Sequence, residues 1–199
     1  MNTLINATRE IYGDGFIPLH RPVFAGDEKA RLVECIDSNF VSSAGELIGE
    51  FESTVAAFTG ARHAVATVNG TAAIQVALRL AGVQPGDEVI TQAFTFIATA
   101  NAVAYTGAEP VFVDVDTDTL GLSPTALERF LADAARPVGE GAGTGVINRH
   151  TGRRIAAVLP MHTFGHLAHI DAIAEVCERY GLPLVEDAAE ALGSWWEGS

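Results

Sequence analysis

The residues of this chain that could do chemistry stand where short apolar runs give way to helical patterns. Val185-Glu186-Asp187-Ala188-Ala189-Glu190 follows one such run. A carboxylate at the end of a buried strand needs a cationic or hydrogen-bonding partner. The protonated ring nitrogen of a flat cofactor would be such a partner for Asp187, and the small Ala188 and Ala189 leave room for the ring. The alternative is a carboxylate that caps the following helix or pairs with an arginine.

A second junction, Val68-Asn69-Gly70-Thr71-Ala72-Ala73, predicts a strand, a loop and the start of a helix. Gly70 allows the backbone to approach a ligand closely, and the amides of a helix N-terminus suit a phosphate group. An ordinary Asn or Thr helix cap is the alternative. The chain has neither GxGxxG nor GxxxxGK[ST], so neither a dinucleotide site nor a P-loop is supported.

Two further junctions carry aromatic and imidazole side chains. In Thr91-Gln92-Ala93-Phe94-Thr95-Phe96, an aromatic ring could stack on a ligand, although packing in the core is the commoner role of a single phenylalanine. In Pro160-Met161-His162-Thr163-Phe164-Gly165-His166, the two histidines would form a metal pair only on a helix, and the proline and glycine favour a loop instead. That loop either contacts a substrate or is structural, and we expect no metal site.

The run Asp114-Val115-Asp116-Thr117-Asp118-Thr119 also resembles a reactive site. It fails as a calcium loop, because its sixth position is Thr119 and its twelfth is Thr125. A phosphatase-like hydrolase with Asp114 as nucleophile and Asp116 beside it would want a later lysine, and none follows. The sequence therefore favours a solvated turn.

The elements that position these junctions alternate between apolar runs and amphipathic helices. The expected strands are Ala64–Val68, Glu88–Thr91, Pro110–Val115, Ile155–Pro160 and Pro183–Asp187. We expect one helix to end at Gly60, another to begin at Ser123-Pro124, and a third, Asp171–Tyr180, to end at Gly181. This alternation predicts an α/β fold with a mostly parallel sheet covered by helices, whose ligands bind beyond the carboxyl ends of the strands. Residues 136–153 read as a long loop or a small hairpin.

Composition excludes several classes of protein. The 199 residues are 48% hydrophobic and carry a net charge of −13, which repels phosphate backbones and acidic lipids. We therefore expect neither nucleic-acid nor membrane binding. The N-terminus has no signal-peptide pattern, and Cys35 and Cys177 match no metal or redox spacing, so we expect buried thiols and a cytoplasmic protein.

Taken together, the junctions resemble the DegT/DnrJ/EryC1/StrS sugar aminotransferases, which are pyridoxal-phosphate (PLP) enzymes of fold type I. The resemblance lies in NGTAAIQVALRLAGVQPGDEVI, FTFIATANAV, GAEPVFVDVDTDTLGLSP, PMHTFGHLAHIDAI and YGLPLVEDAAEALGS, in this order. PLHRPVFAGDE and NFVSSAGELIGEFE are similar to the start of that family. The N-terminal block and MHTFGH most resemble the branch that makes legionaminic acid and related surface sugars.

The resemblance implies a role for individual residues. Asp187 would bind the pyridinium nitrogen, Phe96 would stack on the ring, and Glu190 would lie near the 3′-oxygen of the cofactor. The phosphate would lie at the turn formed by Gly70, Thr71 and Ala72. For the sugar-nucleotide pocket, the matching residues are Ser42, Ser43 and His162.

The reaction implied by the resemblance has two halves. An amino acid, expected to be L-glutamate, converts PLP to pyridoxamine phosphate (PMP), which then aminates a nucleotide-linked 4-keto-6-deoxy sugar. In the family the active site forms across a homodimer.

The chain departs from the family pattern in one respect. The lysine that holds PLP as a Schiff base follows the EDAAEALGS block in the family, whereas the only lysine here is Lys29. We expect residues 1–199 to be an N-terminal arm and an incomplete PLP-binding domain, without the last strands and the small C-terminal domain. Alone, this chain is expected to be inactive; the alternative function is a noncatalytic fragment that binds a cofactor or partner.

Overall fold

The computed structural model describes residues 2–18, 22–42, 45–137 and 146–195. Its chain divides into two compact units, Met1–Ala66 and Thr67–Ser199. The first unit contains three helices, α1 (Asn2–Tyr12), α2 (Glu28–Asp37) and α3 (Glu46–Thr59). The guanidinium of Arg31 on α2 donates to both carboxylate oxygens of Glu50 on α3, at 3.4 and 3.1 Å. The helix expected to end at Gly60 is confirmed, because Gly60 caps α3 with a φ of 71°.

The second unit is built on a five-stranded sheet with the order β2-β1-β5-β4-β3. The central strand β1 (Glu88–Gln92) pairs parallel with β2 (Glu109–Val113) on one side and with β5 (Arg154–Val158) on the other. The short strands β3 (Ala135–Pro137) and β4 (Val146–Asn148) pair antiparallel with each other, and β4 pairs antiparallel with β5. The small hairpin expected in residues 136–153 is therefore present, with residues 138–145 outside the described part.

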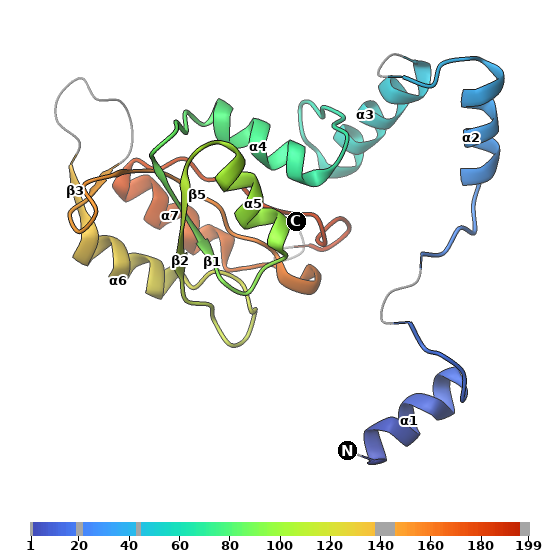
Figure 1. Ribbon diagram of the computed structural model, residues 1–199, viewed down its shortest axis with the longest axis horizontal. Helices are drawn as coiled ribbons and strands as arrows, with labels where there is room; N and C mark the ends of the chain where they lie inside the picture. Colours follow the sequence, from blue (N-terminus) through green and yellow to red (C-terminus); the bar gives the residue numbers. More distant parts are fainter. Residues whose placement is uncertain (1, 19–21, 43–44, 138–145, 196–199) are drawn as a thin grey trace. The chain divides into compact units, whose positions relative to one another are not determined.

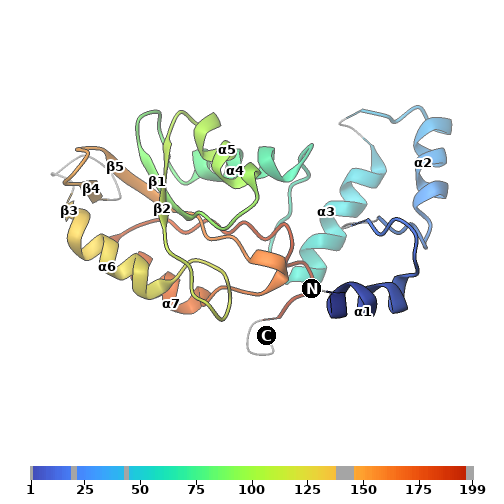
Figure 2. The same ribbon diagram turned by 60° about the horizontal axis from the view of Figure 1, so that its bottom comes forward.

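Helices cover both faces of this sheet (Figure 1). On one face lie α4 (Gly70–Leu80) and α5 (Ile97–Tyr105), and on the other lie α6 (Pro124–Ala134) and α7 (Ile170–Tyr180), as Figure 2 shows from a second direction. Neighbouring residues of β1 point to opposite cores, since Val89 packs with the first pair of helices and Ile90 with the second. The α/β class with a mostly parallel sheet covered by helices is confirmed.

Local capping explains where the helices start and stop. Ser123 accepts a hydrogen bond from the amide of Ala126, and Pro124 occupies the first turn of α6. Gly181 ends α7 with a φ of 63°, a left-handed conformation that glycine adopts without steric cost. Both boundaries agree with the sequence analysis.

Two of the five expected strands are wrong as regular strands. Residues 64–68 form no strand, and the side chains of Val65 and Val68 are 81% and 89% exposed. A strand is stable only when a neighbour completes its hydrogen-bond ladder, and no described residue pairs with this segment. Residues 183–187 make only two isolated parallel bridges, Leu184 with Val158 and Asp187 with Met161.

The described residues include no helix with the length and apolar composition needed to cross a membrane.

Candidate functional site

Polar residues of the second unit meet at the carboxyl ends of β1 and β5. The segment around Asp187 runs beside the end of β5, because the Asp187 amide donates to Pro160 O at 2.9 Å and the His162 amide donates to Asp187 O at 3.1 Å. Gln92, the last residue of β1, crosses to the same segment. Its side-chain amide donates to Met161 O at 2.6 Å and accepts from the Met161 amide at 3.1 Å. This edge is the ligand-binding edge of open α/β sheets.

The carboxylate of Asp187 is buried, with only 6% of the residue exposed. Its Oδ2 accepts a hydrogen bond from Thr99 Oγ1 at 2.7 Å, and its Oδ1 accepts from the Ala189 amide at 3.3 Å. Thr99 lies in the first turn of α5, and its Oγ1 is also 2.7 Å from Thr95 Oγ1. Two hydrogen bonds leave lone pairs on both oxygens, since a carboxylate offers about four acceptor positions.

No arginine, lysine or histidine of the described residues forms an ion pair with Asp187. Asp87, at the opposite, amino end of the sheet, does have a cationic partner. Its carboxylate accepts hydrogen bonds from both Nε and Nη2 of Arg154. That contact raises the pKa of Arg154 above its ordinary value, through the hydrogen bonds that Arg154 donates to Asp87 more than through the charge of Asp87. A buried carboxylate without a cation is costly, so the environment of Asp187 fits a ligand that brings a charged N–H donor.

A cavity of about 170 Å³ opens beside these residues, and three phenylalanines form part of its wall. Phe94 and Phe164 meet edge to face, with ring centroids 6.0 Å apart and planes at 81°. Phe96, the residue before α5, is 69% exposed and its ring is free to cover a ligand. The complete lining is Phe94, Thr95, Phe96, Met161, Thr163, Phe164 and Glu190. Thr95 and Met161 connect this lining to Asp187 through the contacts given above.

The loop that carries Phe164 is held in a strained conformation. Phe164 has a φ of 56°, and its amide donates to Glu190 Oε2 at 2.7 Å. Gly165 follows with a φ of 78°, and a Cβ there would lie 2.8 Å from Glu190 O. Ser194 Oγ donates to Gly165 O at 2.8 Å. Glu190 therefore shapes the wall of the cavity, and strain of this kind often accompanies a functional site.

The N-terminus of α4 keeps free backbone donors. Asn69 caps the helix by accepting from the Ala72 amide at 2.9 Å, so the expected cap is present. The amides of Gly70 and Thr71 have no partner within the described part of the chain. Free amides at a helix start can bind a phosphate, and the cap and the phosphate site therefore do not exclude each other.

His162 is buried, and both of its ring nitrogens are engaged. Nδ1 accepts from the Ala168 amide at 3.1 Å, and Nε2 lies 3.0 Å from Glu186 Oε2. An imidazole nitrogen that accepts carries no proton, so Nε2 is the nitrogen that donates to Glu186. The buried His162 side chain thus stabilises its loop through contacts with Ala168 and Glu186. Its contact with a substrate stays a prediction.

The remaining predicted residues belong to the first unit. Ser42 lies in a cavity of about 330 Å³ together with Cys35, Ser38, Phe40 and Leu47. Ser43 lies outside the described residues.

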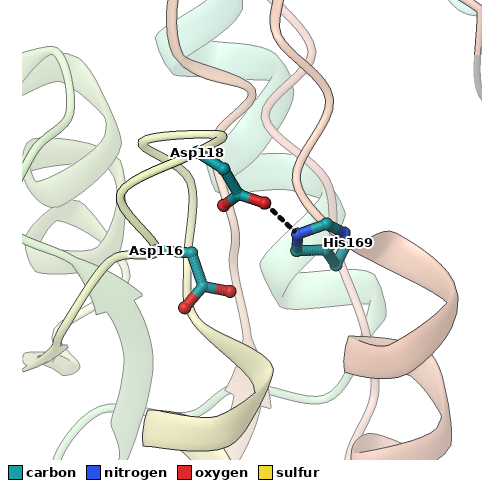
Figure 3. Close-up of side chains that lie close together, drawn as sticks. All are labelled: Asp116, Asp118 and His169. Carbon is teal, nitrogen blue, oxygen red and sulfur yellow. Dashed lines mark hydrogen bonds and ion pairs between the residues drawn. The ribbon is translucent and has the colours of Figure 1, made fainter.

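The acidic run after β2 forms a turn, as favoured by its sequence. Asp114 is exposed and accepts from the amide of Val115 at 3.0 Å. Asp118 Oδ2 lies 2.9 Å from Nε2 of His169, the residue before α7 (Figure 3). Although the ligand atoms of Asp116, Asp118 and His169 lie within 4.8 Å of one another, no second feature of the described residues points to an ion there. The hydrogen bond between Asp118 and His169 connects the turn to the start of α7.

Sequence reasoning missed Thr99, Thr95 and Gln92. Each lies in or beside the FTFIATANAV block or at the end of β1. The available signal was a polar residue at the end of an otherwise buried strand, together with threonines four positions apart at a helix start. Such threonines share one face of a helix.

Known proteins are similar to this chain over most of its length. The model of the DegT/DnrJ/EryC1/StrS aminotransferase family matches residues 23–199. EpsN of Bacillus subtilis (strain 168), named as a pyridoxal phosphate-dependent aminotransferase, is 41% identical over 182 residues, which are 92% of this chain and 43% of EpsN. GDP-perosamine synthase of Caulobacter vibrioides is 38% identical over 92% of this chain and 44% of that protein. The chain thus spans less than half the length of these curated relatives.

Solved structures show the same fold. DesI, crystallised in the presence of its TDP-sugar product, superimposes with a TM-score of 0.68 and 35% identity over 94% of this chain and 44% of DesI. NtdA from Bacillus subtilis, with PMP as bound cofactor, gives a TM-score of 0.71 and 26% identity over 90% of this chain and 37% of NtdA.

Proposed function

Because the chain belongs to the PLP-dependent DegT/DnrJ/EryC1/StrS aminotransferase family, we propose that it forms part of an enzyme that aminates a nucleotide-linked 4-keto-6-deoxy sugar, with L-glutamate as the amino donor. The observation that carries this proposal is the carboxylate of Asp187, which is buried without a cation beside an aromatic cavity. Such a carboxylate suits the protonated pyridine nitrogen of PLP or PMP.

The residues of this chain have distinct tasks in the proposal. Asp187 accepts the ring N–H and keeps the proton on that nitrogen, because its negative charge favours the protonated form. Phe96 covers the ring. The amides of Gly70 and Thr71 bind the phosphate, and Ala72 completes the turn in which they lie. When bound, the cofactor supplies an electron-accepting ring and carries the amino group. Glu190 lies toward the 3′-oxygen while its other contact holds the loop at Phe164.

The names of the relatives support the substrate class. One relative is a GDP-perosamine synthase, and DesI was crystallised with a TDP-sugar product. We therefore propose a GDP- or TDP-linked 4-keto-6-deoxy sugar, made for a surface polysaccharide or glycan. Ser42, Ser43 and His162 are the proposed substrate contacts, and the complete enzyme is proposed to be a homodimer. Both cysteines are free, which fits the proposed cytoplasmic location.

We further propose that a polypeptide of these 199 residues binds the cofactor without turnover. Its only lysine, Lys29, lies on α2 in the first unit. Transamination needs a base that moves a proton between the cofactor and the substrate, a role that lysine fills in PLP enzymes.

The test is a titration of the 199-residue polypeptide with PMP, followed by changes in PMP fluorescence. We expect saturable binding that is weakened strongly by Asp187→Asn and left unchanged by Asp114→Asn, which alters an exposed carboxylate after β2. A GDP- or TDP-linked 4-keto-6-deoxy sugar should then bind more tightly to the PMP-loaded chain than to the free one. Absence of PMP binding would refute the proposal. Amino-sugar formation from glutamate above background would refute the inactivity of this polypeptide.

A further inference from the structure

Two threonines at the start of α5 form a hydroxyl chain that ends on the carboxylate of Asp187. Thr95 Oγ1, Thr99 Oγ1 and Asp187 Oδ2 follow one another at 2.7 Å and 2.7 Å. We propose that Thr99, supported by Thr95, is a positioning residue that fixes the orientation and the charge of Asp187 toward the ring nitrogen of the cofactor. This inference rests on the proposed function.

The direction of the hydrogen bonds follows from the chemistry of the groups. An ionised carboxylate only accepts, so the single hydroxyl proton of Thr99 goes to Asp187. Thr99 has no second proton, and the bond between the two threonines must therefore be donated by Thr95. Both bonds point toward the negative charge, and hydrogen bonds in such a chain polarise and strengthen one another. The two hydrogen bonds thus hold Oδ2 of Asp187 in one position.

The hydrogen bond of the Thr99 hydroxyl differs from those of two other helical threonines among the described residues. Thr8 donates to Leu4 O at 2.8 Å, and Thr59 donates to Val55 O at 2.8 Å, each four residues back in its own helix. That contact is the ordinary one for a helical threonine. Thr99 is fully buried, yet its hydroxyl bonds to a side chain 88 positions away in the sequence. A buried hydroxyl needs a hydrogen-bond partner, and the partner of Thr99 is the Asp187 carboxylate instead of a carbonyl of its own helix.

The start of α5 carries both the residue proposed to stack on the cofactor ring and the residue that orients the Asp187 carboxylate. Phe96 immediately precedes α5 and accepts from the Thr99 amide at 3.1 Å through its carbonyl. The position of the stacking ring and the orientation of the carboxylate are therefore set by one helical turn. Thr99 occupies Oδ2, and the Ala189 amide occupies Oδ1 at the longer distance of 3.3 Å. The remaining lone pairs of the carboxylate are held in a fixed direction, which favours a single orientation of a donor N–H.

The experiment compares PMP binding by the 199-residue chain and by Thr99→Val, which keeps the shape of the side chain and removes the donor. We expect the dissociation constant for PMP to rise roughly tenfold, the factor that corresponds to the loss of one hydrogen bond to a charged group. PMP labelled with ¹⁵N in its ring gives a second readout. At one neutral pH, the ring-nitrogen resonance should move toward its unprotonated position in Thr99→Val.

Three further variants separate positioning from packing. Thr99→Ser keeps the hydroxyl and should restore both readouts. Thr106→Val removes another buried hydroxyl at the end of α5, one that donates to Val103 O at 2.7 Å, and should leave both unchanged. Thr95→Val removes only the outer donor and should raise the dissociation constant about threefold, because a neutral hydrogen bond contributes less. This variant keeps the inference testable if Thr99→Val does not fold.

The outcomes are distinct. If the unmodified chain does not bind PMP, the proposed function fails, and this inference fails with it. If the unmodified chain binds PMP while Thr99→Val and Thr95→Val match it in affinity and in ring-nitrogen resonance, the positioning role alone is overturned. The same conclusion follows if Thr106→Val weakens binding as much as Thr99→Val does.

Discussion

Replacing Asp187 by asparagine should change the free protein and the cofactor complex in opposite directions. The carboxylate is 6% exposed and has no ion-pair partner within the described residues. Asparagine has the same shape and can still accept from Thr99, but it carries no charge. The free protein therefore loses a buried charge that has no cationic partner among the described residues, whereas the complex loses the partner of the ring N–H.

The expected magnitudes follow from these two contacts. In the free protein, relief of desolvation exceeds the weakening of the hydrogen bond from Thr99 and the loss of the longer one from the Ala189 amide, so the free energy of unfolding should rise by about 1 kcal/mol. In the complex, breaking a buried charge pair costs about 3 kcal/mol, which corresponds to a roughly 100-fold weaker binding of PMP.

Thermal unfolding with and without PMP measures both effects. At a PMP concentration 100 times the dissociation constant, the unmodified chain should gain about 2.7 kcal/mol, whereas the variant at its own dissociation constant should gain about 0.4 kcal/mol. For a chain of this size these values correspond to increases in Tm of about 8 °C and about 1 °C. Without PMP, the Tm of Asp187→Asn should exceed that of the unmodified chain by roughly 3 °C.

Two results would refute this reasoning. A variant that keeps the full PMP-dependent increase in Tm would show that the Asp187 carboxylate does not bind the ring nitrogen. A variant that unfolds several degrees lower without PMP would show that the charge is well compensated in the free protein. Asp114→Asn is the matched control, and its Tm should respond to PMP as that of the unmodified chain does.

Three other features of the chain give predictions of their own. The buried hydroxyl of Thr91 has no hydrogen-bond partner among the described residues, so Thr91→Val should raise the free energy of unfolding in urea by about 1 kcal/mol; a decrease of that size would contradict this. Burial raises the pKa of the Cys177 thiol to about 12. Iodoacetamide at about pH 8 should therefore modify Cys35 and spare Cys177 in the native protein, because only the thiolate reacts; peptide mass spectrometry showing native Cys177 modified would be the opposite result. The hydrogen bond to His169 holds the pKa of Asp118 below its ordinary value of 3.8. A carboxyl group with a lowered folded-state pKa adds stability above its unfolded pKa and loses that stability as the pH falls through the folded value. Asp118→Asn should thus lower the Tm at neutral pH, and the difference from the unmodified chain should shrink below about pH 4; a constant difference in Tm across this range would exclude the effect.

Much of the fold follows from local signals in the sequence. The caps at Ser123 and Gly181 are fixed by side-chain and backbone chemistry within a few residues, so the ends of α6 and α7 were predictable. The strands β1, β2 and β5 were predictable because a parallel sheet covered on both faces needs runs that are apolar on both faces. The same topology brings the ends of β1 and β5 to one edge, which is why Asp187 and Phe96 could be expected near each other.

What the sequence could not show depends on partners far away in the chain. Residues 64–68 have the composition of a strand, but strand formation is decided by a hydrogen-bonding neighbour. The antiparallel pairing of β4 with β5 could not be predicted from a run of three residues. The hydroxyl of Thr99 could bond to its own helix or to Asp187, and periodicity does not distinguish the two. The engagement of both His162 nitrogens was hidden for the same reason.

A crystal structure of this chain with PMP would show whether Asp187 binds the ring nitrogen of the cofactor at the carboxyl edge of the sheet. The proposed binding mode predicts the ring nitrogen within about 3 Å of a carboxylate oxygen of Asp187, the distance of a charge-assisted hydrogen bond. It also predicts the ring against Phe96 and the phosphate at the amides of Gly70 and Thr71. A PMP molecule bound with its ring nitrogen away from Asp187, or with its phosphate away from the start of α4, would contradict it.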